Sequence, residues 1–299
     1  ALLEKERSLG EKSQKGHIDI PRLISGGINA QIFAVFVRPE WYHNAVHATM
    51  KGISILKREI HKNSEKIRLV DNFNDIEDTF AQGKIAALLS IEGGEALQGD
   101  LDMISIYREL GVTSLVLTWN NRNAIADGAL DFRSKGGLSE FGVKVIREME
   151  KVGMIVDVSH ISPKAFWDVI DVATKPLIVS HSLPRSLSDT PRNLDDEQIR
   201  AVSTKGGVIG VSLYFASYGG TQGTIENVLD AIDYFVNIGG IDHVGLGSDF
   251  DGFSGTVLGL ETCEQMINIT RGMISRGYSD EEIQKVLGKN FLRVFKETL

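Results

Sequence analysis

Cysteine is nearly absent from this sequence, since Cys263 is the single one among 299 residues. One thiol can form neither an internal disulfide nor a cysteine-based zinc site. We therefore expect a protein of a reducing compartment, the cytoplasm, in which a chain of this length buries enough core to need no covalent cross-links. Cys263 has no recognisable catalytic setting, and we expect it to be a core or surface residue.

An excess of positive charge is also absent. The chain has 32 basic and 40 acidic residues, a net charge of −8, and no basic run. Nucleic-acid binding depends on clustered Lys and Arg that neutralise phosphates, so we expect no such partner. The longest apolar stretches, such as Ile85–Ile91, are far shorter than the ~20 residues that span a bilayer, and no signal or lipidation motif is visible. We expect no membrane association.

Several well-known catalytic motifs are missing as well. The sequence contains no Gly-x-Ser-x-Gly elbow, no Walker loop and no strand-linked dinucleotide fingerprint. His43 and His47 stand four residues apart, but the glutamate of a His-Glu-x-x-His zinc motif is lacking. We interpret them as a surface or packing pair, and His61 and His243 as structural.

What the sequence does contain is an alternation of apolar runs and amphipathic stretches. The runs are nearly continuous in apolar character, which is typical of parallel strands buried on both faces. Seven such strands are predicted: 32–37, 85–91, 114–119, 154–158, 177–180, 208–213 and 243–248. Helical patterns lie between them at 44–70, 138–151 and 163–172, and a Ser279–Glu282 capping box opens a last helix towards Phe295.

This alternation predicts an α/β fold, a (β/α)₈ TIM-like barrel. Seven strands are one short of a closed barrel, and the first twenty residues are too polar to supply the eighth. Either the sheet is open or the first strand lies upstream of Ala1. Since no linker or low-complexity tract interrupts the chain, we expect a single domain over residues 1–299.

Polar residues gather where the predicted strands end. In parallel sheets these carboxyl ends share one mouth, where active sites form. Each residue also has a structural interpretation, as a helix cap, a buried histidine or an Asx turn. Their joint occurrence after separate strands favours a metal or catalytic site with nitrogen and oxygen ligands. The clustered residues are Glu92, Trp119, Asn120, Asn121, Asp157, Ser159, His160, His181, Ser182, Asp249 and Asp251.

The motifs that carry these residues resemble those of the membrane (renal) dipeptidase family, zinc dipeptidases of the amidohydrolase superfamily. The resemblance extends from about Gly16 to the C-terminus, and it is specific because the motifs occur together in this order. It implies a barrel of the metal-dependent hydrolase type. The motifs are Ser90-Ile-Glu-Gly-Gly94, Leu117-Thr-Trp-Asn120 with Ala126-Asp-Gly128, Ile155-Val-Asp-Val-Ser-His160, Ile178-Val-Ser-His-Ser182, Arg192-Asn193 and Gly245-Leu-Gly-Ser-Asp-Phe-Asp-Gly252.

The resemblance implies roles for individual residues. Glu92 looks like the carboxylate that bridges two zinc ions (Zn²⁺), and His160 and His181 look like ligands of the second zinc. Arg192 is similar to the arginine that binds the substrate carboxylate. Asp249 is similar to the catalytic aspartate that meets the substrate amino group and shuttles a proton.

The implied reaction is hydrolysis of small dipeptides, including those with a C-terminal D-residue, by a metal-activated hydroxide. Tyr214 stands where family members line the substrate cleft. Trp119 replaces a substrate-facing histidine of the mammalian members, and its indole N–H can still donate a hydrogen bond. Family members often dimerise, so a homodimer is a further expectation.

The family's first zinc ligands, a His-x-Asp pair at the end of strand one, have no clear counterpart. The only such pair is His17-Ile-Asp19. Its surroundings resemble a later segment of the family, just before strand two, so we expect neither residue to be a ligand. We expect the sequence to begin just after the true pair.

Two other functions stay open at this point. One is hydrolysis of a cyclic amide or lactam by another amidohydrolase-type activity, although Arg192 and Asp249 favour free-terminus dipeptides. The other is a metal-depleted homologue that binds peptides without cleaving them.

Overall fold

The structure, a computed structural model, describes residues 7–215 and 223–299. Its centre is a curled sheet in which all pairings between the described strands are parallel. The strands are β1 (Ala30–Phe36), β2 (Ile67–Leu69), β3 (Ile85–Glu92), β4 (Val112–Val116), β5 (Ile155–Asp157), β6 (Ile178–Ser182), β7 (Val208–Val211) and β8 (Val244–Leu246).

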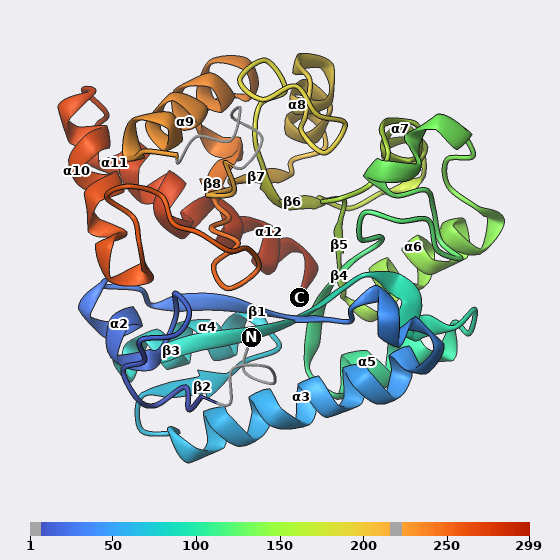
Figure 1. Cartoon of the computed structure of the whole chain (residues 1–299), viewed down its shortest axis with the longest axis horizontal. Helices are drawn as coiled ribbons and strands as arrows, with labels where there is room; N and C mark the ends of the chain where they lie inside the picture. The colour runs from blue at the N-terminus through green and yellow to red at the C-terminus, as the bar shows by residue number, and fades with distance from the viewer. Residues whose placement is uncertain (1–6, 216–222) are drawn as a thin grey trace.

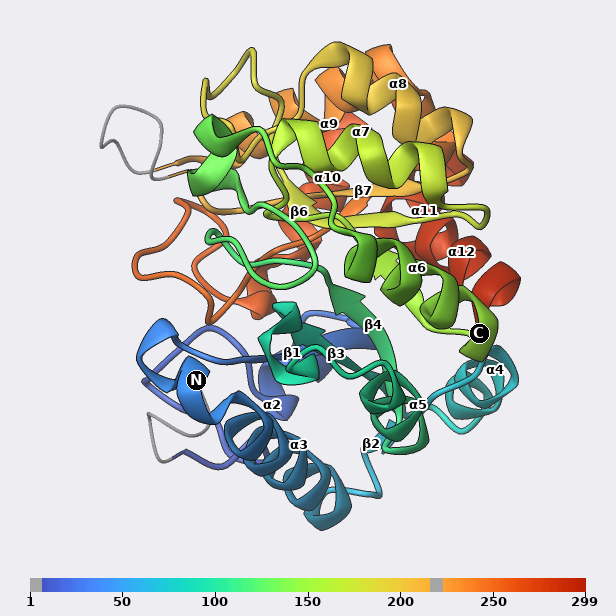
Figure 2. The ribbon, with the colours of Figure 1, turned by 90° about the vertical axis from the view of Figure 1, so that its right-hand side faces the viewer.

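Helices surround this sheet in a ring (Figure 1). Seen from the side, α3 and α5 cover one end of the sheet and α7 and α8 the other (Figure 2). The helices are α2 (Ile20–Ser25), α3 (Ala45–Lys62), α4 (Phe73–Ala81), α5 (Asp102–Glu109), α6 (Glu140–Val152), α7 (Pro163–Val172), α8 (Asp196–Thr204), α9 (Ile225–Gly239), α10 (Ile267–Ser275), α11 (Asp280–Gln284) and α12 (Asn290–Thr298).

The predicted α/β fold of parallel strands is therefore confirmed, and all seven predicted runs contain a strand. The pairing order is β1-β3-β4-β5-β6-β7-β8, with β2 paired to the first half of β3. No pairing joins β1 to β8 within the described ranges, so the sheet curls like a barrel and stays open between these two strands.

Two of the predicted helices were wrong in extent. The helix expected over 44–70 ends at Lys62, and residues 67–69 form β2 instead. The last helix does begin at the Ser279–Glu282 capping box, but it is divided into α11 and α12 by a π-helical turn at Lys285–Lys289. Gly288 has non-helical backbone angles in that turn, which explains the break.

The register of the strands places the polar strand ends beside one another. Glu92 pairs with Phe36 on one side and with Val116 on the other, and Val116 pairs in turn with Asp157. In β3 every residue before Glu92 is buried, so the strand is fixed by its apolar side chains and its last residue emerges at the mouth.

Candidate metal centre

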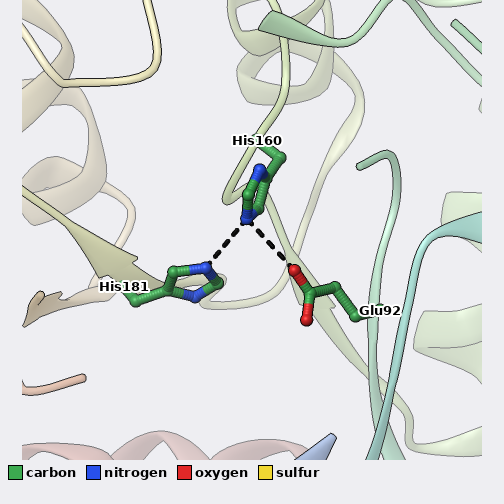
Figure 3. A group of neighbouring side chains, drawn as sticks. All are labelled: Glu92, His160 and His181. Atoms are coloured by element: carbon green, nitrogen blue, oxygen red, sulfur yellow. Dashed lines mark hydrogen bonds and ion pairs between the residues drawn. The ribbon is translucent and has the colours of Figure 1, made fainter. Parts of the chain in front are cut away.

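Three strand ends bring Glu92, His160 and His181 together (Figure 3). Glu92 ends β3, His160 follows β5, and His181 lies in β6. His160 Nε2 is 3.1 Å from Glu92 Oε1 and 2.9 Å from His181 Nε2. The ligand atoms of all three residues lie within 4.8 Å of one another, so the group could hold a metal ion. Two imidazole nitrogens and a carboxylate oxygen are ligands that Zn²⁺ prefers.

The outer nitrogens of both imidazoles have partners of their own. His160 Nδ1 lies 2.8 Å from Asn120 Oδ1, and His181 Nδ1 lies 2.9 Å from Ser180 Oγ. An Nδ1–H that donates to an amide oxygen leaves Nε2 of His160 with its lone pair. The rings are thus held with their Nε2 atoms facing the same point as the Glu92 carboxylate.

The side chain of Asp157, at the end of β5, is hydrogen-bonded to the backbone of β6 next to the two histidines. Its carboxylate accepts the backbone N–H groups of Ser159 at 2.9 Å and of Ser180 at 3.1 Å. Ser159 Oγ in turn accepts the backbone N–H of His181 at 3.2 Å. His160 itself adopts a left-handed backbone conformation with φ of 64°, which is uncommon for residues other than glycine.

The electrostatics of the group suit a cation. Burial, together with the positive charge of Arg192, holds the pKa of both His160 and His181 well below the usual value. Both imidazoles are therefore neutral and can offer an electron pair to a metal ion. Burial raises the pKa of Glu92 to about 7, against the lowering effect of Arg192. A buried carboxylate whose ionisation is this costly is one that a bound cation would stabilise.

Arg192 and Asp249 lie beside this group. Arg192 Nη2 donates to the backbone carbonyl of His181 at 2.8 Å. Burial and then the negative charge of Glu92 raise the pKa of Asp249 to about 7, although Arg192 lowers it. Asp249 can therefore gain or lose a proton near neutral pH.

The two predicted aromatic residues line the same cavity, which has a volume of about 1410 Å³. The Trp119 ring lies 5.1 Å from the Phe36 ring and 6.3 Å from the His160 ring, between centroids. Tyr214 is 43% exposed and its ring packs 5.6 Å from Phe253. The cavity continues inward between β1 and β8, where the sheet is open.

The remaining histidines and the cysteine lie elsewhere. His43, His47 and His61 are exposed, and His243 Nδ1 lies 2.8 Å from the carbonyl oxygen of Gly207. Cys263 is buried in the core. The carboxylate of Asp19 caps α2 by accepting the backbone N–H of Arg22 at 2.9 Å, and His17 hydrogen-bonds to the loop after β8.

Sequence reasoning gave no role to three residues that support the histidines. Asn120 and Asp157 were recognised only as polar strand-end residues, and Ser180 as the end of a strand. A signal did exist for Asp157, because an acidic residue inside the apolar run Met154–Val158 needs buried partners. Which donor it would face depends on the register of β5 against β6, which the sequence does not reveal.

Comparison with known proteins relates the whole chain to one family. The family model described as membrane dipeptidase, peptidase family M19, matches residues 2–299. The chain is 33% identical to dipeptidase tcpJ of Claviceps purpurea, over 96% of this chain and 70% of that protein. It is 32% identical to the uncharacterized dipeptidase C965.12 of Schizosaccharomyces pombe, over 96% of this chain and 74% of that protein.

Solved structures share the fold. The probable dipeptidase PvdM of Pseudomonas aeruginosa superposes with a TM-score of 0.90 at 26% identity, covering 96% of this chain and 90% of that one. A Rhodobacter sphaeroides metallopeptidase, liganded with a phosphinate mimic of the dipeptide L-Ala-D-Ala, has a TM-score of 0.91 at 23% identity, with 97% and 92% covered. Over the described residues, no helix combines the length and apolarity needed to cross a membrane.

Proposed function

Because the chain belongs to the membrane dipeptidase family and is thereby a metallodipeptidase-type hydrolase, we propose that it is a zinc-dependent enzyme that hydrolyses small dipeptides. The observation that carries this proposal is the convergence of Glu92, His160 and His181 at one buried point beside Arg192 and Asp249. The proposed substrates include dipeptides with a C-terminal D-residue.

We propose that Glu92, His160 and His181 hold the metal. A divalent zinc ion bound there would supply a Lewis acid that polarises the peptide carbonyl and lowers the pKa of water. Two neutral imidazoles with orienting partners and one carboxylate are the donor set that supports zinc over magnesium or calcium. The family holds two ions, and Glu92 would be the residue shared with the other ion, whose His-x-Asp ligands have no clear counterpart in this sequence.

The substrate-binding residues follow from charge. Arg192 presents a planar guanidinium at the cavity, which suits the free C-terminal carboxylate of a dipeptide. Asp249 suits the free amino group, and its pKa of about 7 supports proton transfer to the leaving amine. Trp119 and Tyr214 would form the walls against which the dipeptide side chains pack. A site that recognises both termini accepts dipeptides and excludes longer peptides.

The test is hydrolysis of a dipeptide panel that includes L-residue–D-alanine substrates. The protein is assayed as prepared, after chelation, and after zinc is returned, with the metal content measured each time. We expect activity to disappear with the chelator and to return with zinc. Glu92→Gln should lose both activity and metal, whereas Glu95→Gln, a matched change three residues later and outside the ligand group, should keep the metal.

The alternatives give different results. A folded, zinc-loaded protein that cleaves a cyclic amide or lactam but no dipeptide would be the other amidohydrolase-type activity. A protein that binds dipeptides and cleaves none would be the binding homologue. Either result would overturn the proposal.

Three further expectations stay predictions. Every proposed site residue lies in a strand of one sheet or in a segment that follows such a strand, which supports a single domain over residues 1–299. The homodimer is tested by the solution mass, and the cytoplasmic location by fractionation of the source cells.

A further inference from the structure

The segment 16–19 carries the only His-x-Asp pair of the sequence, yet the proposed reaction does not use it. The structure lays this segment against residues 249–255, called here the β8 loop because it follows β8. The two segments are more than 230 residues apart in the chain. The β8 loop begins with Asp249, the proposed proton shuttle, so whatever holds the loop also determines where that carboxylate lies.

His17 and Asp251 form a reciprocal pair of hydrogen bonds. The backbone N–H of His17 donates to Asp251 Oδ1 at 2.7 Å, and the backbone N–H of Asp251 donates to His17 Nδ1 at 3.0 Å. On the other side of the ring, His17 Nε2 lies 3.0 Å from the carbonyl oxygen of Gly255. One neutral tautomer, protonated at Nε2, satisfies both ring contacts at once. His17 therefore connects the middle of the β8 loop to its end.

The imidazole is also enclosed by the loop. Its ring centroid lies 5.4 Å from that of Phe250 and 5.4 Å from that of Phe253, and His17 is 8% exposed. A hydrogen bond shielded from water in this way is costly to break, because the backbone N–H of Asp251 would lose its acceptor inside the protein. The contact is thus a buried attachment of the loop.

The loop needs such an attachment because its backbone is strained. Asp249 has φ of 57° and Asp251 has φ of 68°, a left-handed conformation that residues other than glycine adopt uncommonly, although aspartate does so more often than most. Strained backbone persists only where surrounding contacts determine it. Arg7 also pairs with the Asp251 carboxylate, so both the main chain and the side chain of Asp251 are held from outside the loop.

The N-terminal segment is shaped for this approach. Gly16 has φ of 78°, and a Cβ placed on it would lie 2.4 Å from Asp251 Oδ1. Glycine is therefore needed both for the turn and for the close contact. The carbonyl of His17 accepts the backbone N–H of Cys263 at 3.2 Å, which anchors the segment to the core beyond the loop.

We propose that His17 is a positioning residue, which holds the β8 loop so that Asp249 faces Glu92 and Arg192 at the cavity. The role in activity rests on the proposed dipeptidase function. The role in holding the loop does not.

The experiment uses His17→Phe, His17→Asn and a control, His243→Phe, in the zinc-loaded full chain. Phenylalanine keeps the ring contacts but has no acceptor for the Asp251 N–H, whereas asparagine offers an acceptor close to the position of Nδ1. The control removes His243, which directly precedes β8 and so lies at the opposite end of that strand from the β8 loop. Its Nδ1 hydrogen-bonds to the backbone carbonyl of Gly207. We expect His17→Phe to lower kcat/KM at least about tenfold, His17→Asn to lower it less, and the control to change it less than twofold.

Two readouts separate positioning from a general loss of stability. Zinc affinity should stay unchanged, since the three ligand residues lie on β3, after β5 and on β6. Asp249→Ala should make the His17→Phe change nearly silent, because a residue that acts through Asp249 has no further effect once that carboxylate is gone. Full additivity of the two losses, or a His17→Phe loss no larger than that of the control, would overturn the proposal.

A third readout needs no activity. Amide hydrogen exchange of the 249–255 peptide should be faster in His17→Phe than in the wild type, with peptides from β3 and β6 unchanged. Unchanged exchange in the β8 loop would refute the attachment. If the wild type cleaves no dipeptide, the proposed function fails, and the exchange result still decides whether His17 holds the loop.

Discussion

Each of the two histidines of the candidate centre is oriented by a neighbouring residue that is not one of the three proposed metal ligands. For His181 this neighbour is Ser180, whose hydroxyl lies 2.9 Å from Nδ1 and whose backbone N–H is held by Asp157. The partner of the outer nitrogen determines the tautomer and the direction of the inner one. Metal affinity should therefore depend on residues that never touch the ion.

Ser180→Ala tests this dependence. Removal of the hydroxyl leaves His181 Nδ1 without that partner, and we expect zinc to bind about tenfold more weakly, the lower end of the usual effect of such changes. Competition with a chromophoric chelator measures the affinity. Ser203→Ala removes a hydroxyl that bonds to the carbonyl of Ile199 on α8 and should leave zinc binding unchanged. Equal affinities for Ser180→Ala and the wild type would contradict the orienting role.

Arg192→Lys tests the recognition of the substrate carboxylate. Lysine keeps the positive charge that acts on Glu92 and Asp249 but loses the planar fork. We expect KM for dipeptides to rise about tenfold or more, since a hydrogen bond to a charged group contributes about 1.5–3 kcal/mol. The preference of the enzyme for a free dipeptide over its C-terminal amide should shrink in parallel.

The matched control is Arg185→Lys, which alters an exposed arginine paired with Asp189. Its KM should match that of the wild type. If Arg192→Lys kept the wild-type preference for the free carboxylate, the assignment of Arg192 would be wrong.

At the residue scale, the sequence predicted the members of the site better than their surroundings. Glu92, His160 and His181 were recognisable because each follows or ends an apolar run. The position of His17 was not, because its contacts with Asp251 and Gly255 connect segments more than 230 residues apart. No periodicity links such segments, and only the folded chain brings them together.

At the scale of elements, the position of the site depends on how closely β6, β7 and the end of β8 approach one another. A Cβ on Gly210 of β7 would lie 2.1 Å from the backbone oxygen of Ser180, and one on Gly247, just after β8, would lie 1.8 Å from the same atom. Backbone atoms cannot move aside as side chains do. The two glycines therefore allow the strand that carries His181 to lie where it does.

Gly210→Ala should accordingly be severe. We expect a loss of about 3 kcal/mol in the free energy of unfolding, the upper end for overpacking, together with weaker zinc binding because β6 must shift. Gly239→Ala is the control, since its Cβ would first meet the Ser203 hydroxyl and the Ile199 side chain, which can move. Chemical denaturation measures both. A Gly210→Ala protein as stable as the control would show that the strands have room to separate.

The elements also show where sequence patterns are sufficient. The strand β3 was predictable because seven of its eight residues are buried, which gives the sequence a long apolar run. Apolar runs of that length are rare in loops. The strand β2 was missed because it has three residues, Ile67-Arg-Leu69, of which only Ile67 is buried. Such a segment continues the amphipathic pattern of α3, and it becomes a strand only because β3 offers it an edge.

At the scale of the whole molecule, metal binding is linked to folding. The three proposed ligands lie on β3, after β5 and on β6, so the unfolded chain does not hold them together, and a zinc ion bound there would stabilise the folded state. The link depends on pH through Glu92. Its pKa is raised in the folded protein, so without metal the folded state holds this proton more tightly than the unfolded state does. That contribution to stability is present at acidic pH and is lost as the pH rises to about 7.

Zinc bound at the proposed site would reverse this dependence, because it would bind the ionised carboxylate. At pH 8 Glu92 is already ionised, whereas at pH 6 a proton must leave first, and the neutral histidines add no competing proton at either pH.

With zinc at a hundred times its dissociation constant, the free energy of unfolding should increase by about 2.7 kcal/mol, which raises the Tm of a chain of this size by about 4 °C. We expect that rise at pH 8 and a smaller one at pH 6 with the same free zinc. Thermal unfolding with and without chelator measures both, and Glu92→Gln should abolish the rise. An equal rise at both pH values would mean that Glu92 does not exchange its proton for the metal.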